Sequence, residues 1–266
     1  MPFEWSIGWR YTRAGRAGRR NTFISFISLV SMLGIALGVA ALIIVLSVMN
    51  GFQKEVSDRM LKAIPHVQLM NDNGEAIADW PALAKKAKAI EPGIAAAAPY
   101  TETQSLLAHG DGMRGAVVRG VDPAEEGGIT ELAADLRREG ILQKLVPGSW
   151  NIVLGAELAR SLGVSVGDQV TVIAPGAQVT PAGALPRLKS FNVVGLFSVG
   201  HYEYDSGLAL AALDDTAKLY RTGGATGVQL RLADVHDARA AAARLAQGLG
   251  DQVDRKSTRL NSSHRP

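Results

Sequence analysis

Between Asn21 and Gln53 the sequence contains no Asp, Glu, Lys or Arg. The middle of this stretch, Phe23 to Met49, supplies about 27 residues, or about 40 Å of helix. Because a bilayer span needs about 20 apolar residues, the stretch predicts one transmembrane helix that can tilt or protrude. A cleaved signal peptide has an apolar region of only about 7–15 residues and a small-residue cleavage site. A helix buried in a soluble protein is rarely apolar on all sides over this length.

Charges on the two sides of this stretch predict its orientation. Five arginines precede it against a single acid, Glu4, whereas the charges that follow it are nearly balanced. Basic residues stay on the cytoplasmic side of a membrane, so we expect a cytoplasmic N-terminus. Everything after Asn50 then lies outside, which in a bacterium is the periplasm. The arginines are Arg10, Arg13, Arg16, Arg19 and Arg20.

Two further features belong to the membrane region. Aromatic and apolar residues alternate from Phe3 to Tyr11, which favours a short helix in the membrane interface. Within the predicted span, Gly34, Gly38 and Ala41 lie near one face. Small residues at this spacing let another helix approach closely, so we expect this face to pack on protein.

The chain after the span alternates between strand-like and helix-like patterns. With 47% apolar residues it can bury a sizeable core, so we expect a membrane-anchored α+β fold whose outer domain is mixed α/β. Strands are expected at 66–70, 95–108, 114–121, 151–154, 169–174, 190–199, 206–213 and 226–232. Helices are expected at 79–90, capped by Asp79, at 130–145, at 156–162, at 214–220, capped by Asp214, and at 235–249, capped by Asp234.

Four segments follow from these patterns. Residues 1–20 form a cytoplasmic N-terminus with the interfacial helix, 21–52 the transmembrane helix, and 53–254 the periplasmic domain. Residues 255–266 form an atypical polar tail that suggests a truncated or misread reading frame.

An insert from Pro175 to Lys189 interrupts the strand pattern with three prolines and few apolar residues. Proline removes a backbone donor and fixes φ, so we expect a stiff exposed loop here rather than a sheet strand.

Few residues in the sequence suggest a catalytic, metal-binding or nucleotide-binding site. There is no cysteine, and the net charge of +3 does not argue for nucleic acid. The run from His201 to Asp205 is the densest cluster of reactive side chains, and it could hold a general base or a metal, but it is more typical of a polar turn. No Gly-Lys-Ser/Thr phosphate loop is present, so any ATP chemistry must belong to a partner. We expect no catalytic, metal or cofactor site.

Several motifs together resemble the lipoprotein-releasing ABC transporter permeases of the LolC/LolE family, and the resemblance covers nearly all of residues 1–254. The motifs are residues 34–43, 46–52, 170–175, 180–183, 186–187, 191–195 and 204–207. The resemblance implies an inner-membrane permease with four transmembrane helices and a MacB-like periplasmic domain between the first two. It implies a separate cytoplasmic ATPase subunit and a second permease subunit, the same or related. The complex would move lipoprotein cargo from membrane lipid to a periplasmic carrier by mechanical transmission.

The resemblance also implies roles for individual residues. A proline-bounded hook in the periplasmic domain would dock the carrier, and apolar residues of the span would line the cargo site. The hook residues are Pro175, Val179, Thr180, Pro181, Ala182, Gly183, Pro186 and Arg187. The cargo-lining residues are Val45, Val48 and Met49.

Two other functions are compatible with parts of the sequence, and a third is not supported by it. A related exporter of macrolides or peptides would keep the same architecture with a different cargo. A single-span protein with a periplasmic ligand-binding domain would account for the single apolar helix but not for the resemblance. A soluble enzyme is disfavoured because no paired carboxylates, triad or metal cluster stands out.

Overall fold

The computed structural model describes residues 21–61, 65–70, 76–180, 183–234, 237–249 and 254–257. The chain divides into two compact units, Met1–Ser57 and Asp58–Pro266.

The helix α2, Asn21–Leu61, is 41 residues long, and its residues up to Ser57 belong to the first unit. Within it, Phe26–Phe52 is long and apolar enough to cross a membrane, and none of its most apolar window is buried. The predicted span is therefore confirmed as an apolar helix. The helix continues past the predicted span and ends at Leu61.

The second unit is built on a closed barrel of six strands. Around the barrel the strands follow the order β3-β7-β4-β6-β5-β2, and β2 pairs with β3 to close it. The β3–β7 and β4–β6 pairs are parallel, and the other pairs are antiparallel. The strands are β2 Ile94–His109, β3 Gly112–Val121, β4 Asn151–Gly155, β5 Gln169–Thr180, β6 Gly183–Phe197 and β7 Leu208–Ala212.

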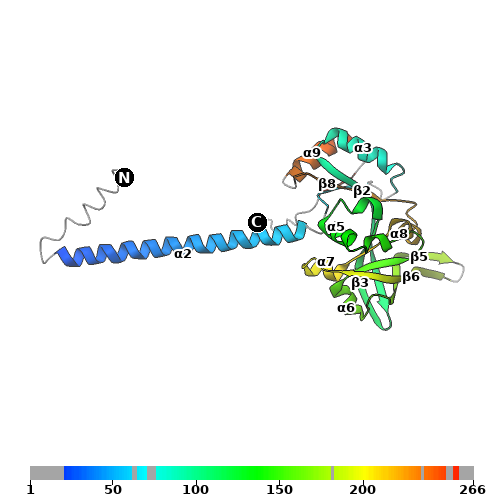
Figure 1. Cartoon of the computed structure of the whole chain (residues 1–266), viewed down its shortest axis with the longest axis horizontal. Helices are drawn as coiled ribbons and strands as arrows, with labels where there is room; N and C mark the ends of the chain where they lie inside the picture. Colours follow the sequence, from blue (N-terminus) through cyan, green and yellow to red (C-terminus); the bar gives the residue numbers. More distant parts are fainter. Residues whose placement is uncertain are drawn as a thin grey trace. The chain divides into compact units, whose positions relative to one another are not determined.

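Three more strands extend the sheet beyond β2, in the order β8-β1-β9, and all three pairings are antiparallel. We call these strands the extension; they are β8 Gly227–Leu232, β1 Val67–Met70 and β9 Asp254–Ser257. Helices α3, Trp80–Ile90, and α9, Ala238–Leu249, lie side by side over the extension (Figure 1). The predicted cap of the first helix is confirmed, since Asp79 Oδ1 accepts from the Ala82 N–H at 2.9 Å.

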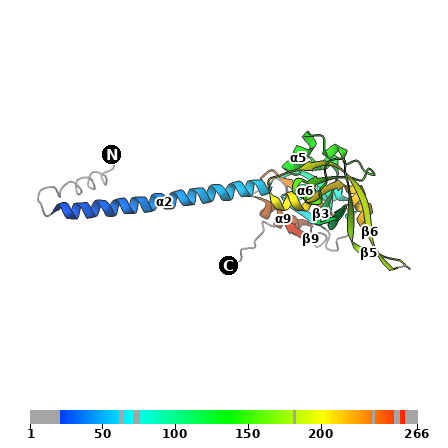
Figure 2. The same cartoon turned by 90° about the horizontal axis from the view of Figure 1, so that it is seen from below.

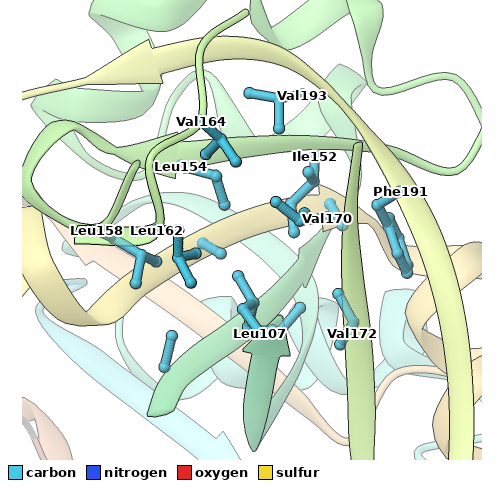
Figure 3. Close-up of a cluster of buried hydrophobic side chains, with 14 of the residues drawn as sticks. Leu107, Ile152, Leu154, Leu158, Leu162, Val164, Val170, Val172, Phe191 and Val193 are labelled. Atoms are coloured by element: carbon cyan, nitrogen blue, oxygen red, sulfur yellow. The ribbon is translucent and has the colours of Figure 1, made fainter. Parts of the chain in front are cut away.

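The barrel interior is filled by alternate residues of its strands, because successive side chains of a strand point to opposite faces (Figure 3). Leu107, Val172 and Phe191 are fully buried there. Helices α6, Ala156–Leu162, and α8, Leu213–Tyr220, add side chains to this core.

A second apolar layer covers the outer face of the barrel next to β7 and β4. It is formed by α5, Glu131–Arg138, and the 3₁₀ turn η1, Leu142–Lys144. The sequence predicted a mostly helical segment over 130–145, and Gly140, at φ +72°, divides it into these two pieces. Gly favours this left-handed conformation because it has no Cβ.

Other expectations differ from the structure in local detail. The short helix α4, Pro123–Glu126, was not predicted. The segment after His201, expected as a polar turn, forms the helix α7, Tyr202–Gly207. Asp214 does not cap its helix, since α8 begins one residue earlier and Ala212 holds the cap position.

At the end of the domain, Asp234 precedes α9, but residues 235 and 236 of the predicted helix lie outside the described residues. Residues 255–257 of the predicted polar tail belong to β9 and pair with β1. The rest of the tail and the predicted segment 1–20 lie outside the described residues.

Candidate docking site on the hairpin of strands 5 and 6

The proline-containing insert is not a loop. Strands β5 and β6 continue through it as a two-stranded ribbon that extends from the barrel (Figure 2). The register pairs Ala177 with Pro186 and Thr180 with Gly183. The prediction of an unpaired loop over 175–189 is therefore wrong, and Pro181 and Ala182 at the turn lie outside the described residues.

The ribbon accommodates its prolines for two different reasons. The register shifts between Ile173 and Ala177, and this irregularity contains Pro175 and Gly176, the latter at φ +80°. Bulges are places where a sheet tolerates proline. Pro186 lies where the ribbon is only two strands wide, so each strand has an open edge on which a missing N–H breaks no ladder bond. The rule that excludes proline from the central strands of a sheet does not apply to these positions.

Arg187 anchors the base of the ribbon to the barrel. Its Nη1 donates to the backbone carbonyl of Tyr220 at 3.1 Å, at the C-terminus of α8. A cation at the C-terminus of a helix is favourable because the exposed carbonyls carry partial negative charge. A Cβ placed on Gly176 would lie 4.0 Å from the Arg187 guanidinium, so this side chain also lies beneath the bulge. Among the predicted hook residues, Arg187 is thus a positioning residue at the base.

The described part of the ribbon carries exposed apolar side chains. Leu185 is 55% exposed and Leu188 is 59% exposed, and Pro175 and Pro186 are exposed beside them. Neither leucine is among the predicted hook residues, although both were visible as apolar residues within the insert. The side chains of Val179, Thr180 and Gly183 are not described, but their backbones lie in the paired ribbon. Leu185 and Leu188 are three residues apart on β6, so by the alternation of a strand they lie on opposite faces of the ribbon.

Lys189 continues the ribbon toward the barrel and packs on it. Its Nζ lies 4.5 Å above the ring of Trp150, and that ring meets Phe191 edge to face at 5.4 Å. These contacts fix the side of the ribbon that faces the core.

The cluster from His201 to Asp205 has a structural role. Asp205 is buried and accepts hydrogen bonds from Ser198 Oγ and the Val199 N–H at 2.8 Å, and from the Gly200 N–H at 3.2 Å. Both carboxylate oxygens therefore hold the turn between β6 and α7. In the part of the chain that the structure describes, no group of three or more His, Asp or Glu side chains could hold a metal ion.

The residues predicted to act within the membrane belong to the first unit, whereas the ribbon belongs to the second. Val45, Val48 and Met49 are exposed on α2. A Cβ placed on Gly34 or Gly38 would meet no described atom within 4 Å. The membrane residues and the ribbon residues form two separate candidate sites.

Comparison with known proteins identifies the architecture. The family model of the MacB-like periplasmic core domain matches residues 28–247. The lipoprotein-releasing system transmembrane protein LolC of Neisseria meningitidis is 47% identical over 241 residues, covering 90% of this chain and 56% of the relative. The corresponding protein LolE of Haemophilus influenzae is 30% identical over 243 residues, covering 90% of this chain and 57% of the relative.

The solved periplasmic region of MacB from Actinobacillus actinomycetemcomitans is also similar, at 15% identity and a TM-score of 0.38, covering 72% of this chain and 87% of that structure. The chain spans little more than half the length of the LolC and LolE relatives.

An apolar helix followed by this mixed α/β domain defines a membrane protein with a MacB-like periplasmic core domain. Within that class, the chain belongs to the LolC/LolE family.

Proposed function

We propose that the chain acts as a permease subunit of an ABC transporter that releases outer-membrane lipoproteins from the inner membrane. One observation carries this proposal: the match at 47% identity to a lipoprotein-releasing system protein runs through 90% of the chain. It therefore includes both the apolar helix and the folded domain. The relatives are longer, so the activity of the whole transporter is assigned here by inference.

Energy enters the transporter through a partner. The sequence has no phosphate-binding loop, so a separate cytoplasmic ATPase subunit hydrolyses ATP. A second permease subunit, the same or related, completes the membrane part, and Gly34, Gly38 and Ala41 on α2 provide a face for close helix packing. Movement of the membrane helices is transmitted mechanically to the periplasmic domain.

The placement in the membrane follows the charge asymmetry of the sequence. Residues 1–20 lie in the cytoplasm, 21–52 cross the inner membrane, and 53–254 form the periplasmic domain. Lipoprotein cargo contacts Val45, Val48 and Met49 near the periplasmic end of the span. All three side chains are apolar and exposed, which suits contact with acyl chains.

The ribbon of β5 and β6 docks the periplasmic lipoprotein carrier. Its support is the exposed apolar side chain of Leu185, with Leu188 exposed on the opposite face, presented on a hydrogen-bonded hairpin. A hairpin that is ordered before binding loses less conformational entropy on docking than a flexible loop would. The anchor from Arg187 to α8 holds the base of this hairpin in place.

Depletion of the protein tests the transport assignment. In the bacterium that encodes it, loss of the chain should cause outer-membrane lipoproteins to accumulate in the inner membrane, as measured by fractionating the two membranes. An unchanged distribution of lipoproteins would contradict the proposal.

The docking assignment has its own test. Leu185→Asp places a charge in the proposed contact, and we expect at least about a tenfold loss of carrier binding, because burying an unpaired charge is costly. Binding is measured by co-purification of the carrier with the detergent-solubilised protein. Met113→Asp is the matched control, because Met113 is 49% exposed on the other long hairpin. Equal binding by the Leu185→Asp variant and the unsubstituted protein would remove the ribbon from the carrier site.

A further inference from the structure

A buried polar cluster lies on the outer face of the sheet where β3, β2 and β8 meet. The cross-strand register places Tyr100 opposite Gly227, and Glu102 opposite Arg119. Gln229 is two residues along β8 from Gly227 and therefore shares its face. The helix α4 covers this face, and its last residue, Glu126, reaches Gln229.

The contact between Glu126 and Gln229 is almost completely removed from solvent. Glu126 is 3% exposed and Gln229 is fully buried. Gln229 Nε2 donates to Glu126 Oε2. Gln229 Oε1 and the Tyr100 hydroxyl are buried as well, and neither has a hydrogen-bond partner among the described residues. Buried polar atoms are nearly always paired, so this cluster holds unused hydrogen-bonding capacity.

The charges around Glu126 do not neutralise it by direct contact. Arg119 donates through Nε and Nη2 to Glu102 Oε2, at 3.0 and 2.6 Å, so its bonds go to the other carboxylate. Asp122 caps α4 with its own negative charge, accepting from the Ala124 N–H at 2.9 Å.

The remaining charged groups of the surrounding elements are directed to other partners or to solvent. From β8, Arg231 is exposed and donates to the Gly128 carbonyl at 3.2 Å. From α5, Arg137 lies against Gly127. Glu125 of α4 and Lys144 of η1 are exposed.

These surroundings favour a protonated carboxyl. Burial raises the pKa of Glu126 to about 7, the nearby Arg119 and the Gln229 hydrogen bond oppose the rise, and Asp122 adds to it. A carboxyl that ionises near neutral pH is unusual, because the ordinary value for Glu is about 4.3.

We propose that Glu126 and Gln229 form a proton-binding site that joins the barrel to the extension. With Glu126 ionised, its carboxylate accepts from Gln229 Nε2, and Gln229 Oε1 is left without a partner. With Glu126 protonated, rotation of the Gln229 amide lets Oε1 accept from the new O–H, because an amide presents a donor and an acceptor at the same place. The proton thus reverses the direction of the hydrogen bond between α4 and β8.

The position of this bond gives the proton a structural effect. Gln229 belongs to β8, the strand through which the whole extension attaches to β2. The β2–β8 ladder is itself irregular between Ile94 and Ala96. A second connection through α4 therefore supports the attachment, and the folded arrangement that buries Glu126 is more stable when this carboxyl is neutral, since burying an ion costs more than burying an acid.

The direction of the pH effect follows from linkage. The native state holds the Glu126 proton more tightly than the unfolded chain does, so the stabilisation is complete at acid pH and is lost as the pH rises toward and through 7. Between pH 5 and pH 8 the unfolding equilibrium constant should rise by up to about two orders of magnitude from this group.

Glu126→Gln tests the site in the full chain in detergent. Urea unfolding followed by circular dichroism at pH 5 to pH 8 should show a steep loss of stability with pH for the unsubstituted protein and a much flatter dependence for Glu126→Gln. Glu125→Gln, one residue away and exposed, should keep the steep dependence. Parallel curves for the unsubstituted protein and Glu126→Gln would overturn the proposal.

Two measurements on the unsubstituted chain cover the case in which Glu126→Gln does not fold. Carbon NMR of labelled glutamate carboxyls should show one group that titrates near neutral pH; titration of every glutamate below pH 5.5 would refute the site.

Hydrogen exchange, corrected for its intrinsic pH dependence, should show β8 losing protection between pH 6 and pH 8 while β4 in the barrel does not. Equal changes in β8 and β4 would refute the proposal that the Glu126–Gln229 contact supports the attachment of the extension to the barrel. Both results are independent of whether the protein transports lipoproteins.

Discussion

At the scale of single residues, two adjacent aspartates at the start of α8 have opposite roles. Asp214 is exposed, whereas Asp215 is fully buried. The carboxylate of Asp215 accepts from the Gly148 N–H at 2.7 Å and from the Trp150 N–H at 3.0 Å. It thereby fixes the turn that leads into β4, and Trp150 adopts a positive φ of 53° within that turn.

Asp215→Ala should destabilise the protein by about 2–4 kcal/mol, because two backbone donors lose a charged acceptor. Asp214→Ala is the matched control and should change the free energy of unfolding by less than about 0.5 kcal/mol. Urea unfolding of both variants measures the difference. A change of equal size in the two variants would show that Asp215 does not fix the turn.

Sequence patterns identified some of these residues and missed others. Asp79 was predicted as a cap and is one, because a cap is a local interaction over three residues. The choice between Asp214 and Asp215 depends on a loop more than 60 residues away, and no local pattern contains that information. Glu126 was missed for the same reason, since its burial is created by β8.

At the scale of elements, the ribbon shows how a correct rule can lead to a wrong prediction. Proline is excluded from the middle of a sheet, and that rule predicted a loop over 175–189. The rule is valid for strands with neighbours on both sides, but this ribbon has neighbours on one side only along its outer part. Strand pairing, a bulge and the hydrogen bond of Arg187 take the place of the proline-stiffened loop that was predicted.

Arg187→Ala should loosen the ribbon without unfolding the domain. The hydrogen bond to the Tyr220 carbonyl is lost, so amide exchange in β5 and β6 beyond Ile173 should become faster while global stability falls by about 1 kcal/mol. Hydrogen-exchange mass spectrometry measures both quantities. Arg114→Ala is the control, since Arg114 is exposed and donates to the carbonyl of its neighbour Met113. Unchanged exchange in the ribbon would show that strand pairing alone holds it.

At the scale of the whole molecule, the sequence predicted the division into an apolar helix and a mixed α/β domain, and the structure confirms both. The span could be predicted because a run of about 20 apolar residues matches the thickness of a bilayer and is rare in soluble proteins. The closed barrel could not be predicted, because its closure depends on parallel pairings between distant segments, such as β3 with β7. Periodicity identifies strands but not their partners.

The orientation of the span can be tested with single cysteines, since the chain contains none. A cysteine replacing Thr12 should be protected from a membrane-impermeant thiol reagent in intact cells, because the arginine-rich side stays in the cytoplasm. A cysteine replacing the exposed Lys85 should react. Labelling of both positions after lysis is the control for reactivity. The opposite pattern in intact cells would reverse the proposed topology.

The β1–β9 pair has a mechanical consequence. Val67 lies opposite Ser257, so the chain enters the periplasmic unit and passes its last described strand at the same end of one antiparallel ladder. Forces that draw these two points apart, across the strands, would load the ladder like a zipper, one hydrogen bond at a time. Forces directed along the strands at opposite ends of the ladder would instead load all of its bonds together in shear. We therefore expect the β1–β9 ladder to open more easily when its two neighbouring chain ends are pulled apart than when the strands are pulled past each other.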